Sequence, residues 1–297
     1  MFNGRYMMHK FLPAIGFSKL NKETLENLIQ EIILRPDYQE SAIDFEGNQF
    51  VELRYMVADN VGLVLRGIYN DKDEFILDYY YPTYLGESIS SNNEVDVIKQ
   101  SDKECYHVMV DELRLGVNLI FHLQNMGEYL RRNTTNGKGV KRDIRLAALS
   151  LEGKVILPLY DNEKSRIKEK MNNKKRIDLV EQAREGNEEA LESLTMDEID
   201  LYQRITRRVS REDILSVVTS FFMPYGIEND KYEIMGDILD VKTVVNHLTM
   251  EELYLLVVES NDVVLEVCIN KNNLYGEPTI GRRFKGTIWL QGTVDFS

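Results

Sequence analysis

A highly charged, helix-forming segment at residues 161–225 lies between two stretches of strand-forming sequence. Its apolar residues recur at helical spacing among many Lys, Arg, Asp and Glu side chains, which predicts amphipathic helices with one buried face. Before and after this segment, short runs of alternating apolar and polar residues predict strands joined as hairpins. The chain is therefore predicted to be an α+β protein, in which the charged helical middle segment joins two antiparallel β-rich parts.

The length of 297 residues exceeds the usual size of one domain, so several units are expected. The first is an α+β domain with an N-terminal helix and an antiparallel sheet at residues 1–160. The helical segment at 161–225 and a β-rich C-terminal part at 226–297 follow it. Capping boxes at Thr195–Glu198 and Ser210–Asp213 predict at least three helices in the middle segment, the last of which ends near Pro224 and Gly226.

Individual elements follow from periodicity and turn residues. An apolar stripe that begins after Asn21 predicts a helix at Lys22–Leu34. Hairpins are predicted where two strand-like runs flank a turn, and Thr249–Glu252 is predicted to cap a short helix. The predicted strand pairs are Val61–Tyr69 with Glu74–Tyr81, Glu104–Asp111 with Gly116–Gln124, and Ile144–Leu151 with Lys154–Leu159 across the turn Glu152-Gly153.

Net charge and cysteine content limit the class of protein. The formal net charge of −13 opposes binding to nucleic acid or to anionic membranes, because those partners require clustered Lys and Arg. No apolar run is long enough to span a bilayer. The two cysteines are far apart and have no CxxC spacing, which is typical of free thiols in a reducing compartment. We therefore expect an acidic cytoplasmic protein that binds neither nucleic acid nor membrane.

A cysteine and two histidines form the first candidate site. If Glu104–Asp111 and Gly116–Gln124 pair as a hairpin, His107 lies opposite His122 or within one register of it. Cys105 then projects from the same face as His107, because side chains alternate along a strand. One thiolate and two imidazoles are suitable ligands for zinc. The alternative is a packed hairpin with amphipathic histidines at its edge.

Three cations between two glycines form the second candidate site. Arg282, Arg283 and Lys285 lie within the segment Gly281–Gly286, where a β-loop could direct guanidinium groups and backbone N–H groups toward a phosphate. The alternative is a solvated, positively charged hairpin end. No catalytic residue is predicted, since the sequence lacks a Gly-x-Ser-x-Gly elbow, a Walker loop, an HExxH motif and a dinucleotide fingerprint. No cofactor is predicted either.

Four short segments carry a family resemblance. They are Met8–Phe17, Leu149–Lys154, Glu192–Thr195 and Phe221–Gly226. Together they resemble the landmarks of an uncharacterised bacterial family of cytoplasmic proteins, a domain-of-unknown-function family, over about residues 8–297. The resemblance implies a bacterial cytoplasmic protein, and it supplies no catalytic residues.

Three functional hypotheses follow. The first is a non-enzymatic interaction or scaffold protein that binds a protein partner or forms a homo-oligomer, with Phe221, Phe222 and Tyr225 as apolar surface. The second is a binding module for a small anionic ligand, a nucleotide or phosphate, at Arg282, Arg283 and Lys285. The third is a metal-dependent enzyme that uses His107 and His122.

Overall fold

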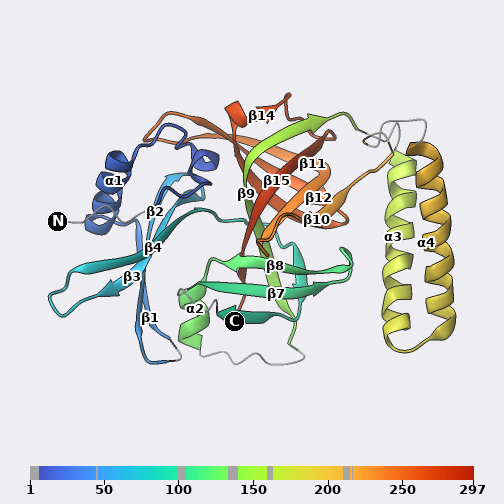
Figure 1. Ribbon diagram of the computed structural model, residues 1–297, viewed down its shortest axis with the longest axis horizontal. Coiled ribbons are helices and arrows are strands. Elements are labelled where there is room, and N and C mark those ends of the chain that lie inside the picture. The colour runs from blue at the N-terminus through green and yellow to red at the C-terminus, as the bar shows by residue number, and fades with distance from the viewer. Residues whose placement is uncertain are drawn as a thin grey trace.

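The computed structural model describes residues 7–44, 46–99, 105–132, 140–158, 163–209, 215 and 217–297. Strands far outnumber helices in it, so the predicted α+β class fits only loosely, and the protein is mostly β with a helical middle segment (Figure 1). No helix of these described ranges has the length and apolar character needed to cross a membrane.

The smaller of two sheets is formed by the strands that follow the first helix. It contains β1 (Tyr38–Ile43), β2 (Gln49–Ala58), β3 (Val61–Tyr69) and β4 (Phe75–Tyr84), in that order and all antiparallel. Helix α1 (Lys22–Leu34) has the predicted bounds, and Asn21 caps it by accepting a hydrogen bond from the Thr24 N–H at 2.9 Å. The apolar stripe of α1 packs on this sheet, and the short helix η1 (Leu12–Ile15) packs between it and the larger sheet.

The larger sheet has eleven strands and joins sequence from both sides of the helical segment. Strand β15 pairs with both β9 and β11, which closes a ring in the order β11, β12, β13, β9 and β15. Short strands, the hairpin β7–β8 and helix α2 extend from this ring. The bounds are β5 (Ser91–Asn93), β6 (Asp96–Lys99), β7 (Tyr106–Glu112), β8 (Val117–Leu123), α2 (Met126–Arg132), β9 (Arg142–Ile156), β10 (Phe221–Pro224), β11 (Lys231–Val245), β12 (Glu252–Ser260), β13 (Val263–Asn270), η3 (Lys271–Asn273), β14 (Leu274–Tyr275) and β15 (Arg283–Val294).

Most ladders are antiparallel, as predicted, but the large sheet is mixed. Strand β9 runs parallel to β13 and β14, and β8 runs parallel to β15. These pairs join strands that are far apart in the chain, and hairpin signals report only neighbouring strands. The predicted division at residues 160 and 225 stays a prediction, although strands before and after the helical segment share one sheet.

The predicted turn at Glu152-Gly153 is wrong, because β9 continues through it as one strand. The ring of Phe284 packs against β9 at Gly153, and a Cβ at this position would lie 2.5 Å from Phe284 Cε2. The glycine therefore provides space for an aromatic ring and does not form a reversal of the chain. A register shift between Thr287 and Ile288 in β15 marks the same place.

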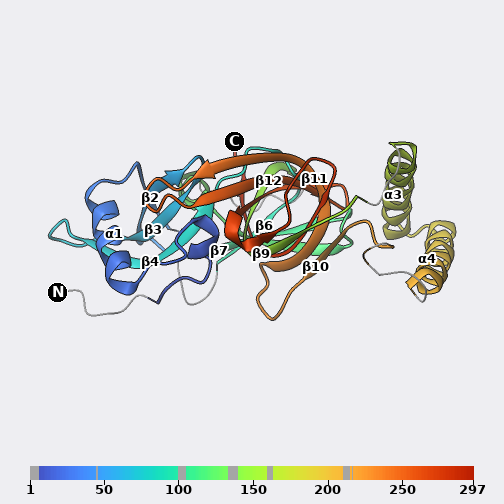
Figure 2. The same ribbon diagram turned by 90° about the horizontal axis from the view of Figure 1, so that it is seen from above.

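Two long helices, α3 (Glu163–Arg184) and α4 (Glu188–Val209), form the middle segment and extend away from the sheets (Figures 1 and 2). They are separated at Gly186, whose φ of 92° allows the turn, and the side chain of Asn187 caps α4. The sequence predicts a break near residues 187–195, and the structure has it at the start of that range. The predicted cap at Thr195 is wrong, since its hydroxyl donates to the Leu191 carbonyl inside α4. The predicted cap at residues 210–213 lies outside the described residues.

Three other predicted features differ from the structure. Phe221–Pro224 is the edge strand β10 and not a helix end, and proline is tolerated at an edge. Of the aromatic residues predicted to offer apolar surface, Phe222 is buried against Tyr232, with ring centroids 4.9 Å apart. Thr249–Glu252 belongs to the β11–β12 hairpin turn, where the Asn246 side chain accepts the N–H groups of Leu248 and Thr249.

Candidate functional site

Three of the four histidines lie around the single tryptophan, where the smaller sheet meets the larger one. The ring centroid of Trp289 is 5.0 Å from that of His9 and 5.6 Å from that of His122. His107 lies 6.0 Å from His122. The fourth, His247, lies elsewhere, against Tyr55. The cluster thus combines the segment before η1, the β7–β8 hairpin and the middle of β15.

The hairpin brings the predicted metal ligands together. Strands β7 and β8 are antiparallel, and His107 is directly opposite His122, which confirms the predicted register. Cys105 lies two residues before His107, so alternation places its side chain on the same face. One ligand atom from each residue lies within 4.8 Å of the other two. A sulfur and two imidazole nitrogens therefore converge at one point.

His122 is the most enclosed of the three, with 2% of its surface exposed. Its Nδ1 is 3.2 Å from Cys105 Sγ, and its Nε2 has no hydrogen-bond partner among the described residues. Burial, together with the nearby charge of Arg66, lowers the pKa of His122 well below its ordinary value. The imidazole is therefore neutral at physiological pH, which is the form that ligates metals.

His107 is held from outside the hairpin by Asp230. Its Nε2 is 3.2 Å from Asp230 Oδ2, and the same oxygen accepts the indole N–H of Trp289 at 2.6 Å. A carboxylate oxygen accepts hydrogen bonds, so Nε2 of His107 is the donor in this contact, and Nδ1 is the ring nitrogen available to a metal. This carboxylate–histidine arrangement is the one that orients ligating imidazoles in metal sites.

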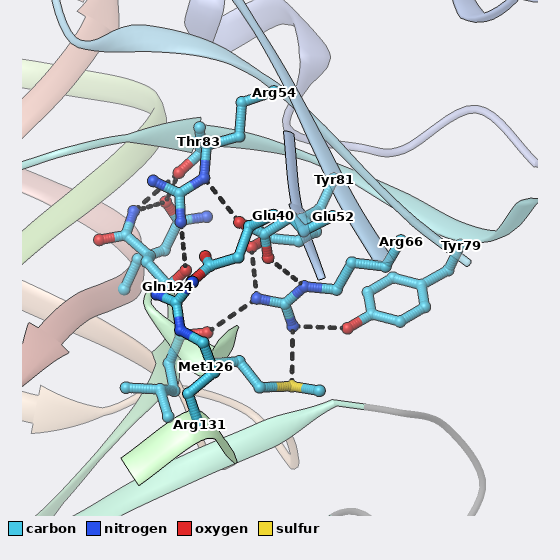
Figure 3. A network of polar contacts seen from close by, with 12 residues as sticks. Glu40, Glu52, Arg54, Arg66, Tyr79, Tyr81, Thr83, Gln124, Met126 and Arg131 are labelled. Carbon is cyan, nitrogen blue, oxygen red and sulfur yellow. Dashed lines mark hydrogen bonds and ion pairs between the residues drawn. The ribbon is translucent and has the colours of Figure 1, made fainter. Parts of the chain in front are cut away.

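Arg66 lies at the centre of a buried polar network (Figure 3). Tyr81 packs its ring edge-on to His122 at 4.5 Å, and its hydroxyl accepts from Arg66 Nη2 at 2.8 Å. Arg66 also donates to Tyr79 Oη at 2.7 Å and to the Leu123 carbonyl at 3.2 Å. Because Leu123 follows His122 in β8, the Arg66 guanidinium fixes the backbone that carries the histidine.

The structure gives each of the three predicted anion-binding cations a protein acceptor. Arg283 is buried and donates to the carbonyls of Leu157, Leu215 and Val218 at 2.8–3.0 Å. Those carbonyls flank the helical hairpin, one before α3 and two after α4. Lys285 pairs with Glu233 at 2.5 Å, and Arg282 donates to the Glu277 carbonyl at 3.0 Å. Anion binding at this segment stays a prediction.

Sequence spacing identified Cys105, His107 and His122, but not their neighbours. Asp230 is 123 residues from His107 and lies in the turn just before β11, and His9 precedes η1. No short motif joins them, because each comes from a different element. Trp289, the single tryptophan, lies in a predicted strand, but the sequence does not indicate which side chains contact it.

Comparison with known proteins gives one match. The family described as "Domain of unknown function, E. rectale Gene description (DUF3881)" matches residues 12–292, which confirms the predicted resemblance to an uncharacterised family. No curated protein and no solved structure matches the chain.

Proposed function

The chain belongs to the DUF3881 family, whose function is unknown, and from its own side chains we propose that it binds a divalent cation of the zinc class at Cys105, His107 and His122. The observation that carries this proposal is the convergence of their three ligand atoms within 4.8 Å. A thiolate with imidazole nitrogens is the donor set that zinc prefers.

The distances fit a zinc site with little movement. Zinc–sulfur and zinc–nitrogen bonds of about 2.3 and 2.0 Å in a tetrahedron place the ligand atoms about 3.3–3.6 Å apart. The contact between Cys105 Sγ and His122 Nδ1, at 3.2 Å, is already close to this value. His107 is half-buried, so its ring can close the remaining gap by a small rotation. Three protein ligands leave a fourth position for water or for a ligand of the cation.

Two neighbouring charges act on the site in opposite directions. The Asp230 carboxylate beside His107 supplies negative charge and holds the ring in the required tautomer. The Arg66 guanidinium is positive. Glu52 pairs with it at 2.7 Å but also with Arg54 at 2.6 Å, so it offsets the Arg66 charge only in part.

The alternative for the same residues is a packed hairpin in which the Cys105 thiol and the His122 imidazole simply share a hydrogen bond. The two differ in one measurable property, since only the metal site retains a stoichiometric ion. The scaffold hypothesis also stays a prediction, and its partner or oligomer would be found by light scattering.

The test is elemental analysis of the purified protein, followed by titration of the metal-free protein with Zn²⁺ against a chromophoric chelator. We expect one ion per chain, lost in Cys105→Ser and His107→Ala. The chain offers matched controls in its other cysteine and in the histidine that lies outside the cluster. Cys268→Ala and His247→Ala are expected to bind Zn²⁺ as tightly as the unaltered protein. Absence of binding at micromolar Zn²⁺, or equal loss in the controls, would overturn the proposal.

A further inference from the structure

Two lysines far apart in sequence bring their ammonium groups together next to the histidine cluster. Lys10 lies just before η1, and Lys231 is the first residue of β11. Both ion pair with the same oxygen of Glu228, Oε2, which is 3.2 Å from Lys10 Nζ. Both ammonium groups also lie over the ring of Phe11, at 5.4 and 5.8 Å from its centroid. The Glu228 carboxylate is therefore held between two ammonium groups, both of which lie over the ring of Phe11.

The burial of the three side chains differs in an informative way. Only 8% of the Lys231 side chain is exposed, whereas 52% of Lys10 and 53% of Glu228 is exposed. Burial, and then the neighbouring Lys10 ammonium, lower the pKa of Lys231 to about 8. Asp230, the adjacent acid, is already engaged by His107 and Trp289. Glu228 is thus the carboxylate that offsets the two closely spaced ammonium groups, and it is exposed enough for another group from solvent to take its place.

We propose that Lys10 and Lys231 form a binding site for a phosphate-class dianion, and that Glu228 occupies this site when the ligand is absent. Two ammonium groups around one carboxylate oxygen leave an excess of one positive charge. A ligand with two negative charges neutralises both lysines, which Glu228 alone does not. Glu228 is at the surface, in the turn before β11, so its carboxylate can rotate into water when a ligand enters.

The position of this dianion site explains why it was not found in the sequence. The lysines are 221 residues apart, and the net charge of the chain is negative. The predicted anion segment at Arg282, Arg283 and Lys285 is a different place, with its own protein acceptors. The dianion site lies across Phe11 from the histidine cluster, since Phe11 stacks on Trp289 at 5.4 Å. It does not require a metal at Cys105.

The experiment titrates the full chain with inorganic phosphate at pH 7.4, below the pKa of Lys231, and at constant ionic strength, read by isothermal calorimetry and thermal shift. Lys10→Met and Lys231→Met are each expected to weaken phosphate binding at least tenfold. Glu228→Gln removes the competing carboxylate, so it is expected to strengthen binding several-fold. A purely structural ion pair would not give that gain. Acetate, a monoanion, is expected to bind much more weakly than phosphate.

Lys271 supplies the matched control. It pairs with the exposed Glu252 at 2.8 Å and lies 5.9 Å from the Tyr254 ring, but it is a single lysine. Lys271→Met is expected to leave phosphate binding unchanged. Three results would each overturn the inference. They are unchanged or weaker binding in Glu228→Gln, equal loss in Lys271→Met and Lys10→Met, and equal binding of acetate and phosphate.

Discussion

Glu52 and Arg66 face each other across β2 and β3, with Oε2 and Nε 2.7 Å apart and neither side chain exposed to solvent. Removing two charges from water is costly, and it is tolerated only when each charge is fully hydrogen-bonded. Arg66 meets this condition with Tyr79, Tyr81 and a carbonyl of β8 (Figure 3). The ion pair therefore joins the smaller sheet to the strand that carries His122.

Breaking this ion pair is expected to destabilise the protein strongly. Glu52→Leu leaves the Arg66 charge buried without its carboxylate, which costs about 3–5 kcal/mol in the free energy of unfolding. The double variant Glu52→Leu/Arg66→Met removes both fully buried charges. It leaves Arg54, the second partner of Glu52, which is partly exposed and still donates to the Gln124 carbonyl, so its loss should be smaller than that of the single variant. Urea denaturation of the three proteins measures this. A double variant less stable than Glu52→Leu would contradict the argument.

The acid stability of the protein is expected to depend on Glu266. Burial alone would raise the pKa of Glu266, but hydrogen bonds from Tyr84 Oη and from the N–H groups of Ser88 and Glu87 hold it below the ordinary value of 4.5. A carboxyl whose pKa is lowered by folding stabilises the native state above its unfolded pKa. That contribution is present at neutral pH and is lost as the pH falls below 4.5 through the folded pKa.

Glu266→Gln should therefore be less stable than the unaltered protein at pH 7, and the difference should shrink between pH 4.5 and pH 3. Tyr84→Phe removes one hydrogen-bond donor to the Glu266 carboxylate, and it should therefore reduce the stability difference in part. Urea unfolding at several pH values gives the comparison. A stability difference that stays constant down to pH 3 would show that the Glu266 carboxylate does not titrate as described.

Arg283 is expected to be important for stability rather than for ligand binding. Its guanidinium satisfies three carbonyls at the base of the helical hairpin, and Arg283→Met leaves them without that donor. The loss of three hydrogen bonds from a buried guanidinium predicts a fall of about 2–4 kcal/mol in the free energy of unfolding. Arg282→Met is the neighbouring control, since Arg282 is only half-buried and donates to one carbonyl. Equal unfolding midpoints for the two variants would refute this role.

Asp230 is expected to tune the affinity for metal without being a ligand. Asp230→Asn removes the charge that orients His107, and changes of this kind weaken metal binding about 10–100-fold. Asp240→Asn, at an exposed position of the same strand, should bind Zn²⁺ normally. Chelator competition measures both affinities. If the two variants bind equally well, Asp230 has only a structural role beside Trp289.

Local patterns predicted the elements that local interactions form. The helix at Lys22–Leu34 and the pairing of His107 with His122 depend on an apolar stripe, a cap and the alternation of a hairpin, all readable over a few residues. Gly153 and Thr195 were misinterpreted because their roles depend on a neighbour. Gly153 gives space to Phe284, and Thr195 bonds back to Leu191. Ring closure, Asp230 and the Lys10–Lys231 pair depend on contacts between distant segments, which no local pattern encodes.

The central place of β15 has a consequence for how this chain folds during translation. Residues 283–294 pair with β8, β9 and β11, and Val294 lies opposite Ile144. On the ribosome, the α3–α4 hairpin can form from local contacts soon after its synthesis. By then the residues of β9 have been synthesised, but the edge of β9 that β15 will cover still lacks its partner strand. That edge stays unprotected until residues 283–294 emerge, which makes the nascent chain most prone to aggregation just before its synthesis reaches β15.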